Sequence, residues 1–169
     1  AALLGWLAGP EGLLTASLLG AAALLQAARL ARWKGWKAAR DPLVVVLHLG
    51  YAWIPAGLGL LAISQLGQGF PRSAAVHALT AGAMGTLILA VVTRSSLSMT
   101  ARKLEAGPAT ILIYALVTLG AALRLAAATS LVKYQLGIEA AAIAWGSAFL
   151  LFVFAYGPIL FAPRLGEKR

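Results

Sequence analysis

The sequence of 169 residues has no cysteine and only five acidic residues. Without cysteine, disulfide bonds and thiolate metal ligands are both excluded. Charged residues amount to 11% of the chain, whereas a soluble domain devotes about a quarter of its residues to charge. The acidic residues lie at the ends of long apolar runs or between them. A cation buried inside a run therefore needs its partner from a ligand or from another segment.

Apolar residues dominate what remains, and they come in long runs. They make up 61% of the chain, with a mean hydropathy of +0.86. A helix needs about 20 residues to cross a bilayer core of roughly 30 Å, and the runs lack the alternation of a membrane β-barrel. We therefore predict an all-α, polytopic transmembrane helical bundle that forms a single domain over residues 1–169. Its five spanning helices are expected at about 11–31, 43–66, 74–93, 109–131 and 139–162.

The basic residues predict the orientation of these helices. The formal net charge is +9, and the segments at and after the ends of the first, third and fifth runs carry five, three and three Lys or Arg. The opposite loops carry only Arg72 and Lys133. Because basic loops stay in the cytoplasm, we expect the N-terminus outside and the C-terminus in the cytoplasm. This placement accounts for the positive charge, and without a recognition module we expect no nucleic-acid partner.

The first residues are expected to follow an earlier part of a larger protein. Residues 1–8 (AALLGWLA) lack the basic start and the cleavage site of a signal peptide. They are typical of the end of a preceding helix, before a turn at Gly9 and Pro10. We therefore expect the chain to be the C-terminal portion of a longer membrane protein, packed against further N-terminal helices.

His48 lies in the second run, about five residues from the expected cytoplasmic end. Tyr51 follows at i+3 on the same helical face, and Pro55 interrupts the helix, which opens space beside it. Ionisable groups inside a membrane are rare and usually face the interior of a bundle. His48 is therefore either a ligand to a metal or cofactor, or a neutral imidazole bonded to a neighbouring carbonyl.

His77 lies in the third run, about three residues from the expected outer surface. His77, Ala81 and Met84 share one helical face at i+4 and i+3 spacing. Beside this face, residues 78–85 contain pairs of small residues four positions apart. Such pairs admit either a neighbouring helix or a flat ligand against the backbone. Both alternatives remain open for this helix.

Arg124 lies inside the fourth run, about seven residues from its outer end and near the depth of His77. A guanidinium there is costly unless it is paired or reaches the surface. It can hold a carboxylate through two hydrogen bonds, including a haem propionate, or it can extend toward water. By depth, His48 and His77 are expected roughly 17 Å apart along the membrane normal. We therefore do not expect them to bind one metal ion together.

Two stretches carry a family resemblance. PLVVVLHLGYAWIP (42–55) and AAVHALTAGAMGTLILAVVTRSSL (74–97) resemble the NnrS family of bacterial inner-membrane proteins. This resemblance implies a twelve-helix protein that contains haem and copper and is associated with nitric oxide metabolism and resistance to nitrosative stress. The last five of twelve helices would also begin outside and end in the cytoplasm.

The resemblance also implies roles for particular residues. His48 and His77 match family histidines, so ligation of haem or copper becomes their leading role. Arg94 and Arg102 match family arginines near the cytoplasmic end. The chain departs from the family at LSMTAR (97–102), where Met99 stands in place of a common histidine. A thioether binds Cu(I) softly, but a lone methionine is more often only a surface residue.

The sequence thus favours a haem- and copper-binding membrane protein that handles nitric oxide, with His77, His48 and Arg124 as cofactor-binding candidates and the two histidines as metal ligands. Catalysis is left open, and no catalytic residue is assigned. The alternatives are a multi-pass transporter or sensor with a polar intramembrane pathway, or an assembly subunit without chemistry of its own.

Overall fold

A computed structural model describes residues 2–8, 12–67 and 69–164, and its regular structure in these ranges is entirely helical. The Gly9–Pro10 turn lies outside these residues. The helices are α1 (Ala2–Ala8), α2 (Leu13–Arg32), η1 (Gly35–Ala38), α3 (Pro42–Gln65), α4 (Arg72–His77), η2 (Ala78–Met84), α5 (Gly85–Met99), α6 (Pro108–Ala128) and α7 (Tyr134–Phe161).

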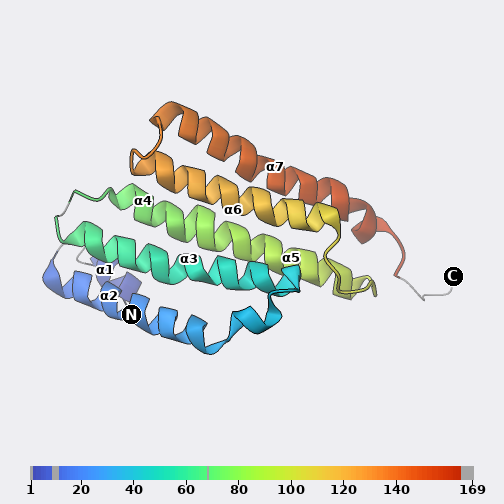
Figure 1. Ribbon diagram of the computed structural model, residues 1–169, viewed down its shortest axis with the longest axis horizontal. Helices are drawn as coiled ribbons and strands as arrows, with labels where there is room; N and C mark the ends of the chain where they lie inside the picture. Colours follow the sequence, from blue (N-terminus) through green and yellow to red (C-terminus); the bar gives the residue numbers. More distant parts are fainter. Residues whose placement is uncertain (1, 9–11, 68, 165–169) are drawn as a thin grey trace.

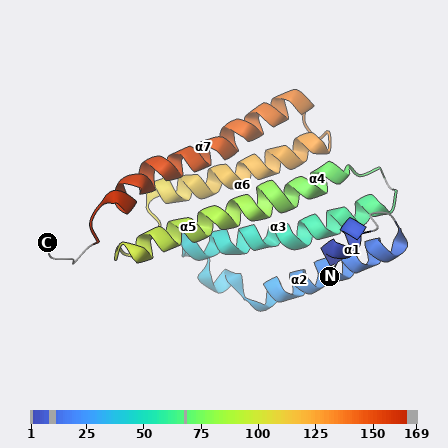
Figure 2. The same ribbon diagram turned by 180° about the vertical axis from the view of Figure 1, so that it is seen from behind.

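Five helices in the described ranges are long and apolar enough to cross a membrane, as predicted. The third of these, Arg72–Met99, is made of α4, η2 and α5, and we call it the third spanning helix. The helices run up and down side by side in the order α2, α3, third spanning helix, α6 and α7 (Figures 1 and 2). Each consecutive pair is antiparallel, so the links α2–α3 and α5–α6 share one end of the row.

Helix ends follow local chemistry. The carboxylate of Asp41 accepts a hydrogen bond of 2.9 Å from the amide of Leu43, which caps α3. Proline occupies the first helical position of α3 and of α6, where its missing N–H costs nothing. The third spanning helix continues to Met99, beyond the predicted end at residue 93. Ser96 and Thr100 bond their hydroxyls to carbonyls four residues back, so these polar side chains are satisfied locally at the end of the helix.

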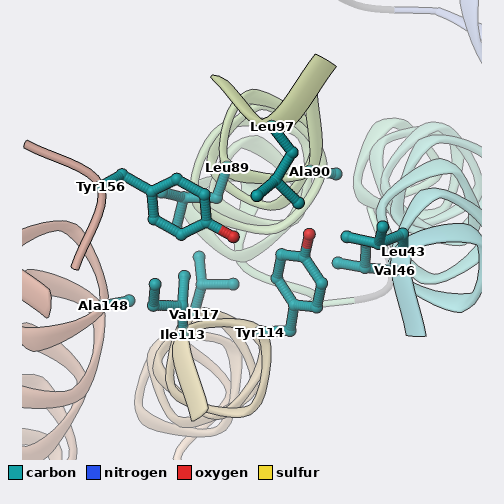
Figure 3. Close-up of a cluster of buried hydrophobic side chains, with 10 residues drawn as sticks. All are labelled: Leu43, Val46, Leu89, Ala90, Leu97, Ile113, Tyr114, Val117, Ala148 and Tyr156. Carbon is teal, nitrogen blue, oxygen red and sulfur yellow. The ribbon is translucent and has the colours of Figure 1, made fainter. Parts of the chain in front are cut away.

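A buried cluster at one end of the row joins four helices (Figure 3). Leu89, Ile113 and Val117 are completely buried within it. The hydroxyls of two tyrosines point into this cluster, and each finds a threonine partner. Tyr114 lies 2.5 Å from the hydroxyl of Thr93, which joins α6 to α5. A second pair, Tyr156 with Thr110 at 2.7 Å, joins α7 to α6, so no tyrosine hydroxyl is left unpaired in the apolar core.

Glycines set the distance between helices. A Cβ at Gly57 would lie 2.6 Å from the side chain of Leu79, and one at Gly50 would lie 2.8 Å from that of Leu87. These contacts let α3 approach the third spanning helix closely. They also fix which residues lie at the same level, since Gly57 faces Leu79 and Gly50 faces Leu87.

The outward faces of the helices carry large apolar side chains. Phe154 is 74% exposed and Ile143 is 69% exposed, although both lie inside α7. A soluble protein rarely exposes apolar surface on this scale, whereas lipid accommodates it without cost. Such faces suit the apolar surroundings of membrane-spanning helices.

The contact between α6 and α7 supplies a stability test. A Cβ at Gly120 would lie 2.8 Å from both the amide nitrogen and the Cβ of Trp145, whereas one at Gly146 meets open space. We expect Gly120→Ala to destabilise the protein by about 1–3 kcal/mol through overpacking. Gly146→Ala should be neutral or stabilising by up to about 1 kcal/mol. Thermal unfolding of both variants in detergent checks this, and equal midpoints would contradict the close α6–α7 contact.

Candidate functional site

A groove of about 530 Å³ runs between the third spanning helix, α6 and α7. We call it the His77–Arg124 groove. Its size lies in the range of small-molecule sites. Its mouth faces sideways, because Met84 and Ile88, near the middle of the third spanning helix, are 59% and 47% exposed. The lining residues are His77, Thr80, Ala81, Met84, Gly85, Ile88, Gly120, Arg124, Ile138, Ala141, Ala142, Trp145 and Phe149.

The polar groups of this groove gather at one end. His77 is the last residue of α4, and Arg124 lies four residues before the end of α6. The structure thus brings together the two residues that were predicted to lie at similar depth. The Nη1 atom of Arg124 is buried and has no hydrogen-bond partner among the described residues. None of the described residues that line the groove is acidic, so this guanidinium is free to accept an anionic partner.

The segment that follows His77 is a π-helix, Ala78–Met84, which the sequence analysis did not predict. Short π-segments inside α-helices occur frequently at functional sites. The residues Ala78–Met84 are small or unbranched except for two, Leu79 and Thr80, and no proline marks the change. The pattern of apolar residues therefore carried no signal for it.

Indole rings pack against the glycine inside this segment, Gly82, and against the glycine directly after it, Gly85. A Cβ at Gly82 would lie 2.6 Å from the ring of Trp53 in α3, and one at Gly85 would lie 2.7 Å from Nε1 of Trp145 in α7. Helix packing therefore accounts for both glycines. Gly85 also borders the groove, together with Ala81 and Met84.

His48 lies in a different environment. Its Nδ1 is 2.9 Å from the carbonyl oxygen of Val44. Because a carbonyl only accepts, Nδ1 carries the proton of this bond, and a neutral ring then has its lone pair on Nε2. Nε2 is buried and has no partner among the described residues. A Cβ at Gly35 would lie 2.8 Å from it, so the link between α2 and α3 covers this nitrogen.

An aromatic ring, that of Trp33, lies beside His48 and connects it to Tyr51. The ring of Trp33 lies edge-on to it with centroids 5.9 Å apart, and the same indole lies 4.5 Å from the ring of Tyr51. The hydroxyl of Tyr51 donates to the side-chain oxygen of Gln26 at 2.6 Å. The guanidinium of Arg29 lies 5.6 Å from the Trp33 ring, within the range of a cation–π interaction. The side chain of the other tryptophan in this link, Trp36, is outside the described residues.

The two histidines are far apart. Gly57 faces Leu79 and Gly50 faces Leu87, so His77 lies about eleven residues, or roughly 17 Å, beyond the level of His48. Within residues 2–8, 12–67 and 69–164, no three His, Asp or Glu side chains gather as a metal site. The candidate ligands therefore belong to two separate places.

The other positions compared with the family, Met99 and Arg102, lie at the opposite end of the bundle from His77. Met99 is 73% exposed at the end of α5, and it lines neither groove. The Nη1 of Arg102 is buried without a partner among the described residues. A second groove of about 520 Å³, between α3 and α6, has Tyr114 as its one titratable side chain in the described part of the chain. The His77–Arg124 groove is thus the better candidate for an anionic cofactor.

The row of five apolar helices, with a histidine and an arginine in a groove that opens sideways, defines a polytopic helical membrane protein. A comparison with protein-family models matches residues 1–164 to the family described as NnrS protein. The chain belongs to this family. Membership suggests a membrane protein related to nitric oxide. No curated protein and no solved structure matches the chain.

The difference in accessibility between the two imidazoles can be tested by chemical modification. His48 and His77 are the only histidines in the sequence, so carbethoxylation by diethyl pyrocarbonate can be followed on two peptides by mass spectrometry. We expect His77 to react faster, because it lines an open groove while Nε2 of His48 is buried.

Two glycine variants provide the control. Gly35→Ala should raise the reactivity of His48, since its Cβ would lie 2.5 Å from the imidazole and must displace the covering loop. Gly107→Ala, which meets open space, should leave both rates unchanged. Equal rates for the two histidines in the wild type would argue against the covered position of His48.

Proposed function

We propose that this chain binds haem in the His77–Arg124 groove, as part of a membrane protein that handles nitric oxide. His77 is the proposed iron ligand, and Arg124 is the proposed partner of a haem propionate. The observation that carries this proposal is the buried Nη1 of Arg124, which has no partner among the described residues and lines the same groove as an imidazole.

The lining chemistry fits such a ligand. A haem binds through an axial ligand such as an imidazole, and it is stabilised by apolar surroundings for its ring and a cationic partner for its carboxylates. The groove provides one imidazole and one guanidinium at its polar end, and Trp145, Phe149 and Ile88 form its apolar wall. The rings of Trp145 and Phe149 are 4.3 Å apart, so the wall is a packed aromatic surface.

When bound, a haem iron with an open coordination position supplies the binding and transformation of small diatomic molecules. The protein's own residues have simpler tasks. His77 holds the cofactor through a ring nitrogen, and Arg124 neutralises its negative charge at the outer end of the membrane. The apolar wall excludes water, and its sideways opening admits molecules that dissolve in lipid, as nitric oxide does.

The copper implied by family resemblance fits the described residues less well. Copper sites are built from several nitrogen or sulfur ligands, and no group of three ligating side chains occurs in the described part of the chain. His48 remains the proposed second ligand position, because its Nδ1–H is held by Val44 and its Nε2 lone pair is free. Such a hydrogen bond orients ligating histidines generally.

We also propose the bacterial cytoplasmic membrane as the location. The basic links α2–α3 and α5–α6 lie at one end of the row, which favours that end as the cytoplasmic one. Of the basic residues expected after α7, Lys168 and Arg169 lie outside the described residues. In this orientation His77 and Arg124 lie near the outer surface and His48 near the cytoplasmic surface.

Haem spectra of the purified full-length protein test the proposal. Reduced-minus-oxidised spectra of the wild type should show haem bands, and His77→Ala should lose or shift them. Arg124→Gln should weaken haem affinity by roughly tenfold or more, because a hydrogen bond to a charged group contributes about 1.5–3 kcal/mol.

Two variants serve as comparisons. Arg72→Gln removes a guanidinium at the same end of the bundle that lies over the ring of Trp6 and outside the groove, and it should leave the spectrum unchanged. His48→Ala reports separately on the second ligand position. A wild type without haem bands, or a His77→Ala spectrum identical to that of the wild type, would contradict the assignment.

A further inference from the structure

The π-helix leaves one carbonyl without its usual donor. In an α-helix the amide of Gly85 would donate to the carbonyl of Ala81, four residues back. Here that amide donates instead to the carbonyls of Thr80 and Gly82. The Ala81 carbonyl therefore loses the bond that continuous α-helix would give it.

Trp145 of α7 supplies the replacement. Its indole N–H donates to the Ala81 carbonyl at 3.3 Å. Inside a membrane an unsatisfied backbone group is costly, and a neighbouring helix is one of the groups that can satisfy it. Among the described residues, this is the one hydrogen bond between a side chain of α7 and the backbone of the π-helix, and it ties the π-segment to the wall of the His77–Arg124 groove.

The indole has little freedom to move elsewhere. A Cβ at Gly85 would lie 2.7 Å from its Nε1, and α7 approaches Gly120 so closely that a Cβ there would touch the Trp145 backbone. Phe149 packs against its ring, with centroids 4.3 Å apart. Two glycines and a phenylalanine thus hold the donor in position at the Ala81 carbonyl.

The π-segment lies directly after His77, so its geometry sets the direction of that side chain. A π-turn contains about one residue more than an α-turn. If the segment became α-helical, α4 would rotate relative to α5 by about 100°, the angle of one residue. Such a rotation would carry His77 out of the groove that it lines with Arg124.

We propose that Trp145 is a positioning residue for His77. By donating to the Ala81 carbonyl it stabilises the π-segment, and the π-segment directs the imidazole into the groove beside Arg124. The role in positioning a haem ligand rests on the proposed function, whereas the effect on helix register does not.

The chain offers a matched control. Trp53 packs its ring against Gly82 of the same π-segment from the side of α3, but it makes no hydrogen bond to this segment in the described structure. Trp145→Phe and Trp53→Phe therefore remove the same N–H from two indoles that contact one segment. Only the first removes a donor from the Ala81 carbonyl.

The helix register of α4 can be measured by cysteine labelling, which requires no cofactor. Because the chain has no cysteine, a single introduced cysteine is the one labelling site. Ala74 and Ala75 of α4 are completely buried. We would introduce Ala74→Cys and Ala75→Cys separately and label membranes with a small methanethiosulfonate reagent. Both should be nearly unreactive in the wild-type and Trp53→Phe backgrounds.

In the Trp145→Phe background a rotated α4 should expose one of the two positions. We expect its labelling to rise roughly fivefold, as the loss of one hydrogen bond allows. Gly85→Ala is a second variant, since its Cβ would displace the indole N–H, and it should give the same pattern. Unchanged labelling in both variants overturns the proposal.

Haem spectra then distinguish an effect of Trp145 on helix register from an effect on the haem ligand. If labelling changes and the haem bands or reduction potential of Trp145→Phe also shift, Trp145 positions the ligand. If labelling changes while bands and potential stay as in the wild type, its role as a positioning residue is wrong. A wild type without haem would end the proposed function, and the labelling would still decide whether Trp145 sets the register.

Discussion

The need to bond every backbone polar group inside an apolar environment governs this structure. Five long helices meet that need by their own hydrogen bonds. The exception lies at Ala81, whose carbonyl does not receive the amide of Gly85 and accepts a hydrogen bond from the indole of Trp145. Because the donor comes from α7, the conformation of the third spanning helix depends on how α6 and α7 pack. Fold and candidate site are therefore coupled at this one contact.

Close helix approach and the groove have a common origin. Gly85 and Gly120 make room for Trp145 on two sides, and the space beside that ring becomes the wall of the His77–Arg124 groove. A tryptophan that packs between helices thus also borders a ligand site. Gly85 and Gly120 therefore act first on helix packing. They affect the groove through Trp145, the side chain for which they make room.

The antiparallel row also separates two chemically different histidines. His77 faces a groove that opens sideways and contains an unpaired guanidinium atom. His48 is held by a backbone carbonyl and covered by the link around Gly35. A neutral imidazole bonded to a carbonyl accounts for the Nδ1 atom of His48. Its Nε2 atom is buried, so ligation there requires the covering link to move. Because His48 and His77 lie far apart, each needs its own set of further ligands.

Sequence alone determined the number of spanning helices and the relative levels of His48 and His77 along them, because long apolar runs and a rise of 1.5 Å per residue depend only on the order of residues. It also separated the two histidines correctly. The tertiary structure alone decided which side chains share a groove, what covers His48, and that Ala78–Met84 is a π-helix. That segment has no proline and an ordinary composition, so its conformation depends on a donor 64 residues away in the chain. Contacts between helices, unlike their lengths, are not encoded in local pattern.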